Sequence, residues 1–216
     1  MKKILSLILI GVLCLSFVGC GAETETKVQG KKSSGDIKKQ YEKIRQDFIA
    51  IKKDLSVDNI QKITGIKPTT IQDGVQKYGE TVYEYKFDYG FDYEAYIKLY
   101  YSHNPKSIYP YDTTRVELKC PDEFFKNSDL DLSGITQEEF KADVDRGFKV
   151  SAINNLAGGN GFADKYEKSA KTGFVDVTSL VWADEKGNYI KSSLRGDETV
   201  ALTDKTLSLV NYTLRQ

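Results

Sequence analysis

The sequence predicts an α+β domain made of two tandem helix-helix-β-β-β(-β) units. A helix-turn-helix pattern occurs twice at a constant offset of 93 residues, as between Ile60 and Ile153. After each copy, apolar and polar residues alternate, which is typical of strands. The sequence DEKGN at 184–188 is typical of a hairpin turn between two such segments. We place the first unit at 36–126 and the second at 127–216.

The first unit opens with an amphipathic helix whose apolar residues recur in steps of three and four. These residues are Ile37, Tyr41, Ile44, Phe48, Ile51 and Leu55. A second helix carries Ile60 and Ile63 and ends at Gly65, where a left-handed cap is expected. The alternating pattern then predicts three strands, at 81–89, 93–101 and 113–119.

The second unit repeats this order of elements. Its second helix carries Ile153 and Leu156 and ends at Gly158. We expect strands at 177–183, 189–195 and 199–203, with an optional fourth strand at 207–214.

The residues of the second unit carry a family resemblance. The segment GFKVSAINNLAGGNG at 147–161, the strand LVW at 180–182 and the turn EKGNYI at 185–190 resemble the repeat of β-lactamase inhibitory protein and of related small envelope assembly lipoproteins. The Gly-Met-Thr of that repeat has become DLS at 54–56 and GFK at 147–149. The resemblance covers nearly all of 37–214. It implies helices on one face of an antiparallel sheet and an open second face, which in the inhibitor grips an enzyme, although β-lactamase inhibition does not transfer with the fold.

The N-terminus is typical of an export signal. Lys2 and Lys3 precede an apolar run from Ile4 to Val18, which is shorter than the roughly 20 residues that a membrane-spanning helix needs. The sequence FVGC at 17–20 resembles a bacterial lipobox, which implies that residues 1–19 are a lipoprotein signal peptide and that Cys20 carries a diacylglycerol anchor. The alternative is a secreted protein with an incidental cysteine. Residues 20–35 hold almost nothing that can be buried and indicate a flexible tether.

Charge and cysteine content exclude several protein classes. The chain has 31 basic and 31 acidic residues, which argues against a nucleic-acid partner because such a partner needs a basic surface. Cys14 leaves with the signal and Cys20 receives lipid, so Cys120 remains as a single thiol that has no partner for an internal disulfide.

Ten of the fourteen tyrosines lie between Tyr78 and Tyr111. Alternation along the two strands places most of them in the core, including Tyr83, Tyr85, Tyr89, Tyr93 and Tyr101. The same alternation places Tyr96 and Tyr100 on the opposite face. Exposed tyrosines are enriched at interfaces, so we predict a binding surface made of Tyr96, Tyr100, Tyr109, Tyr111, Lys98, Tyr189 and Arg195. The alternative role for Tyr96 and Tyr100 is cross-strand support on a solvated face.

Alternation in the second unit gives a similar division. It predicts that Leu180, Trp182, Ile190, Leu194, Val200 and Leu202 point inward. Tyr189, Lys191, Ser193 and Arg195 are then expected to point outward.

Two segments that are candidates for chemistry favour structural roles. The segment DLDLSGITQEEF at 129–140 is similar to a calcium-binding EF-hand loop, but Phe140 stands where the twelfth-position glutamate is required. Thr136 and Glu139 instead fit a helix capping box, and a weak calcium site is the alternative. His103 is the single histidine, and no nucleophile motif accompanies it. We therefore expect no catalytic residues, no metal and no cofactor.

These patterns together predict a non-enzymatic lipoprotein held at the extracytoplasmic face of the cell membrane. Its expected partner is an envelope or extracellular protein. The alternative is a lipoprotein that binds a small molecule or glycan through its exposed tyrosines, which requires a concave pocket with a few convergent polar groups.

Overall fold

The computed structural model describes residues 34–77, 79–103, 113–170 and 172–215. Residues 38–216 form one compact unit that contains the whole described core, and residues 1–37 form a separate unit. The predicted signal segment, Cys20, Tyr109 and Tyr111 lie outside the described residues.

The order of elements along the chain alternates helical and strand-rich segments. The helical elements are α2 (Ser34–Ile51), α3 (Val57–Thr64), α4 (Asp122–Phe125), α5 (Gln137–Asp145), α6 (Val150–Ala157) and the 3-10 turn η1 (Leu202–Asp204). The strands are β1 (Thr69–Lys77), β2 (Glu80–Asp88), β3 (Tyr96–His103), β4 (Thr113–Lys119), β5 (Phe162–Lys168), β6 (Val175–Ala183), β7 (Tyr189–Arg195) and β8 (Thr206–Thr213).

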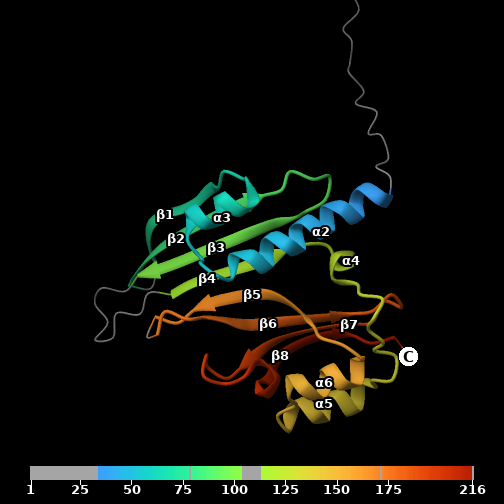
Figure 1. The fold of residues 1–216 in the computed structure, drawn as a ribbon. Coiled ribbons are helices and arrows are strands. Elements are labelled where there is room, and N and C mark those ends of the chain that lie inside the picture. The colour runs from blue at the N-terminus through green and yellow to red at the C-terminus, as the bar shows by residue number, and fades with distance from the viewer. Residues whose placement is uncertain (1–33, 78, 104–112, 171, 216) are drawn as a thin grey trace, which may run out of the picture. The chain divides into compact units, whose positions relative to one another are not determined.

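The eight strands form one antiparallel sheet in chain order, from β1 to β8 (Figure 1). The prediction of two tandem helix-helix-strand units is therefore wrong, although the fold class is α+β. Strand β4 pairs directly with β5, with Val116 opposite Tyr166, so the sheet continues past the expected end of the first unit. The physical reason is that two separate sheets would each expose an unpaired edge at this point, whereas their pairing satisfies both backbones.

The strand predicted at 93–101 begins only at Tyr96 and extends to His103, and the strand predictions also differ from the structure at three other places. Strands β1 and β5 were not predicted, because β1 is a mostly exposed edge strand and β5 is interrupted by register shifts around Asp164. The strand expected at 199–203 is wrong, since a turn and η1 occupy this part of the chain. Val200 and Leu202, expected to point inward, are 36% and 38% exposed.

Local capping chemistry explains where the short helices begin and end. The Ser56 side chain accepts a hydrogen bond from the Asn59 backbone N–H and caps the start of α3. Gly65 ends α3 with φ +72°, and Gly158 ends α6 with φ +77°. Both predicted left-handed caps are confirmed. Glycine occupies these positions because a residue without a Cβ adopts a positive φ at little cost.

The helices attach to the sheet through aromatic contacts. Phe48 of α2 stacks on Tyr166 of β5 with ring centroids 4.8 Å apart. Phe140 of α5 meets Tyr212 of β8 edge-on at 5.3 Å. The predicted core position of Trp182 is confirmed: the side chain is fully buried, and its Nε1–H donates to Asn154 Oδ1 of α6 at 2.9 Å. These contacts join elements from both halves of the chain into one core cluster.

Candidate ligand-binding pocket

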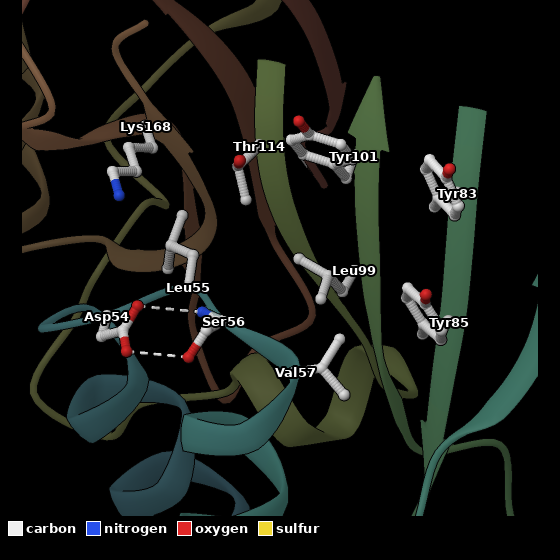
Figure 2. Close-up of a pocket in the computed structure, with 10 residues that line it drawn as sticks. All are labelled: Asp54, Leu55, Ser56, Val57, Tyr83, Tyr85, Leu99, Tyr101, Thr114 and Lys168. Atoms are coloured by element: carbon white, nitrogen blue, oxygen red, sulfur yellow. Dashed lines mark hydrogen bonds between the residues drawn. The ribbon is translucent and has the colours of Figure 1, made fainter. Parts of the chain in front are cut away.

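A cavity of about 460 Å³ lies between the corner that joins α2 to α3 and the helix-facing side of the sheet (Figure 2). Tyr85, Leu99, Val116 and Tyr166 occupy successive opposed positions on β2 to β5, so they share the face that contacts α2. The residues that line the cavity are Asp54, Leu55, Ser56, Val57, Tyr83, Tyr85, Leu99, Tyr101, Thr114 and Lys168.

Three tyrosines form one wall of the cavity. Tyr83 and Tyr85 extend from β2, and Tyr101 extends from β3 directly opposite Tyr83. The rings of Tyr83 and Tyr101 have centroids 5.8 Å apart and planes inclined by 42°. All three side chains are half-buried, so part of each ring faces the cavity.

Gly74 in β1 helps to position the first of these rings. Its φ is +64°, and the Tyr83 hydroxyl oxygen lies 3.5 Å from the point where a Cβ on Gly74 would stand. The register of β1 against β2 shifts on both sides of Gln72. The irregular backbone of this edge strand therefore brings Gly74, which has no side chain, close to the Tyr83 hydroxyl.

The floor of the cavity is apolar. Leu55, at the α2–α3 corner, is 1% exposed, and Leu99 of β3 is 3% exposed. Val57, the first residue of α3, packs against the same core cluster. A ligand that enters this space would exchange water for aliphatic side chains, which favours an apolar ligand body.

The polar groups of the cavity fall into two sets. Asp54 accepts hydrogen bonds from the Ser56 backbone N–H at 3.0 Å and from the Ser56 hydroxyl at 2.8 Å, so both of its carboxylate oxygens are engaged. Within the described part of the chain, Lys168 forms no ion pair and the hydroxyls of Tyr83 and Tyr85 form no hydrogen bond. The polar groups left for a ligand therefore include the Lys168 ammonium, which only donates, and two tyrosine hydroxyls, which can donate or accept.

The predicted binding residues of β3 do not belong to this cavity. Tyr96, Lys98 and Tyr100 lie on the opposite face, as alternation predicts. The Lys86 ammonium lies 4.5 Å from the centroid of the Tyr96 ring, and the Arg115 guanidinium lies 4.9 Å from that of the Tyr100 ring. These contacts agree with the alternative role of cross-strand support.

Charged neighbours also occupy the rest of this surface. Lys98 Nζ lies 2.7 Å from Glu84 Oε1 on the neighbouring strand β2. Lys86 and Asp88 of β2 form a second ion pair on this face, and a partner protein would have to displace or accept both pairs.

Tyr189 lies in a second hollow, on the face of β7 that also carries Lys191 and Ser193. This polar groove of about 590 Å³ is lined by residues of β4, α4, β6, β7 and β8 and of the turn between β6 and β7. Burial raises the pKa of the Tyr189 hydroxyl, and the nearby Asp122 and Asp164 raise it further. Arg195 is exposed at the end of β7. Among the predicted binding residues that the structure describes, Tyr189 lines this groove, and Tyr96, Lys98, Tyr100 and Arg195 do not.

Lys191 connects distant strands beneath this groove. Its Nζ lies 2.5 Å from Oδ2 of the fully buried Asp164 and 3.9 Å from Oε1 of Glu117. Glu117 is on β4, and Lys191 is on β7. An ion pair that reaches across β5 and β6 indicates a concave sheet surface at this point.

Sequence reasoning assigned the three tyrosines of the cavity to the core and so missed the pocket. One signal was available in the residue types. The inward face of these strands carries tyrosine at 83, 85 and 101, although phenylalanine, as at Phe87, would fill a dry core. A buried hydroxyl usually requires a hydrogen-bond partner. Three tyrosines on one inward face therefore indicate a wet or ligand-filled space.

The other predicted chemical groups have structural roles. The Thr136 hydroxyl accepts from the Glu139 backbone N–H at 3.3 Å, which confirms Thr136 as the N-cap of α5. The same hydroxyl donates to Glu139 Oε2 at 2.8 Å, so the glutamate contacts the cap through its side chain. Cys120 is a buried free thiol, and burial raises its pKa to about 12. A thiol protonated at neutral pH is a poor nucleophile.

No family model matches the chain, and neither a curated protein nor a solved structure shows a significant match to it. The resemblance to the β-lactamase inhibitory protein repeat therefore stays a prediction from short motifs. Among the residues that the structure describes, no helix is long and apolar enough to cross a membrane.

Proposed function

We propose that the chain is a non-enzymatic lipoprotein, anchored through Cys20 at the extracytoplasmic face of the cell membrane, that binds a small organic ligand in its tyrosine-lined cavity. The observation that carries the proposal is the cavity. It has the size, the apolar lining and the few convergent polar groups that characterise small-molecule sites. The lipobox sequence at 17–20 supports the anchor.

The chemistry of the lining supports binding rather than catalysis. Nucleophilic catalysis needs a hydroxyl or thiol beside a base that can take its proton. The Ser56 hydroxyl instead caps α3, and its partner Asp54 also accepts from the Ser56 backbone. Both side chains therefore serve to hold the α2–α3 corner in place against the sheet.

A cavity-filling variant with a matched control tests this function. Thr114→Trp would place an indole in the cavity, whereas Thr113→Trp would place it on the opposite face of β4. The full chain and both variants, in lipid nanodiscs, are equilibrated with an extract of small metabolites, and bound compounds are identified by mass spectrometry. We expect to find compounds that bind to wild type and to Thr113→Trp but do not bind to Thr114→Trp. Equal retention by all three proteins would refute a binding role for the cavity.

A second candidate function is protein binding through the face that points away from α2. The groove beside Tyr189 favours it, because half-buried tyrosine and mixed charges are typical of polar interfaces. A photo-crosslinking residue placed at Asn211, which lines the groove, is expected to capture one defined envelope protein. The same crosslinker in a Ser193→Trp variant, whose indole blocks the groove, should capture much less. Crosslinking that is unchanged by the block would exclude the groove as the contact surface.

A further inference from the structure

We infer that the cavity selects an amphipathic anion, namely a carboxylate with an aromatic or branched aliphatic body. The carboxylate would meet Lys168, and the body would lie between the tyrosine wall and the leucine floor. This inference rests on the proposed ligand-binding function and specifies its ligand class.

The first support is the unpaired ammonium beside the cavity. Two hydrogen bonds from Ser56 hold the Asp54 carboxylate at the α2–α3 corner, and this carboxylate forms no ion pair with Lys168. The Lys168 ammonium has three donor hydrogens and forms no ion pair with a described residue. A carboxylate on the ligand matches this donor with a charge-assisted hydrogen bond.

The second support is the position of Lys168 relative to the apolar lining. Figure 2 shows Lys168 on the side of the cavity away from Tyr83 and Tyr85, with Leu55 and Leu99 between them. A ligand whose charged group meets Lys168 therefore places its other end against these side chains. The tilted pair of Tyr83 and Tyr101 offers ring faces and edges on which an aromatic or branched aliphatic body can pack.

The third support is the contrast between Lys168, the last residue of β5, and Lys165, at the centre of the same strand. Lys165 lies opposite Glu117 in the β4–β5 register, on the face that points away from α2. Lys168 lies opposite Thr114, which also lines the cavity. The two lysines have equal charge and nearly equal position along the chain, but one of them alone lines the cavity.

The test compares an acid with its neutral amide. The full chain in phosphatidylcholine nanodiscs is titrated with 3-phenylpropionate and with 3-phenylpropanamide, using saturation-transfer difference NMR with empty nanodiscs as the blank. We expect the acid to bind about fivefold more tightly than the amide, because a partly exposed charge pair contributes a gain in affinity of this size. Lys168→Gln should remove this preference, so that acid and amide bind about equally, whereas Lys165→Gln should retain the preference.

The outcomes separate the two proposals. Equal binding of acid and amide by wild type, or equal loss of the preference in both lysine variants, overturns the inference about the anion and leaves the pocket intact. Tighter binding of 3-phenylpropylamine than of the acid overturns it as well. Binding of all ligands that survives Thr114→Trp, or no binding of any ligand, overturns the ligand-binding function itself. Fluorescence of the buried Trp182 in the lysine variants, and circular dichroism in Thr114→Trp, which carries a second indole, show whether the fold is retained.

Discussion

Replacing Gly161 by alanine should destabilise the protein through a steric clash with its one tryptophan. An added Cβ at this position would lie 2.6 Å from Trp182 Cε2 and 2.8 Å from Cδ2. The indole is fully buried and bonded to Asn154, so it cannot move away without losing packing or this hydrogen bond. Overpacking of this kind costs about 1–3 kcal/mol, and we expect a loss of about 2 kcal/mol in the free energy of unfolding.

The assay is urea unfolding followed by Trp182 fluorescence, on a fragment that begins at Ser34 and carries the whole core. With a denaturant slope of about 2 kcal/mol/M, the midpoint should fall by about 1 M. Gly134→Ala is the control, because a Cβ on Gly134 meets no atom within 4 Å and its effect should stay within about 0.5 kcal/mol. Equal midpoints for the two variants would show that the indole of Trp182 is not held where the structure places it.

Three further predictions address the buried pair, the helix cap and the thiol. Lys205 is 1% exposed and pairs with Asp176. Lys205→Met should lower the free energy of unfolding, measured in urea, by about 3–5 kcal/mol because it leaves Asp176 without its partner, and Lys205→Met/Asp176→Asn should lower it less. A single variant as stable as wild type would contradict this prediction. Thr136→Ala should cost about 1 kcal/mol because it removes the α5 cap, whereas added Ca²⁺ should leave the midpoint unchanged; a calcium-dependent midpoint would favour the EF-hand alternative. Burial raises the pKa of Cys120 from 9.0 to about 12, so its contribution to stability is complete below pH 9 and is lost as the pH rises towards 12. The slope of stability against pH in this window should flatten in Cys120→Ala, and an unchanged slope would assign it to other groups.

The local elements could be predicted because their signals lie within a few residues of one another. The left-handed caps at Gly65 and Gly158, the N-cap at Thr136 and the alternation along β4 and β7 each depend on neighbouring backbone and side chains. The core position of Trp182 followed from the same alternation. Such features survive whatever the rest of the chain does, provided that one side of each element is buried.

The candidate site could be predicted only in part. The sequence marked the tyrosine cluster as unusual, and alternation separated its two faces correctly. It assigned binding to Tyr96 and Tyr100, whose rings lie beside Lys86 and Arg115. The cationic neighbours come from other strands, so their positions depend on the register of β2, β3 and β4 and not on the local sequence.

The sequence by itself therefore determined the kinds of element, their caps and the inward faces of the regular strands. Tertiary structure alone decided that β4 pairs with β5, which makes one sheet where two units were expected. It also decided that Tyr83, Tyr85 and Tyr101 line a cavity, although Tyr85 also packs against the core cluster as predicted. The physical reason is that strand pairing and cavity formation depend on segments far apart in the chain, here the α2–α3 corner and four strands, and no short-range pattern encodes how closely such segments approach.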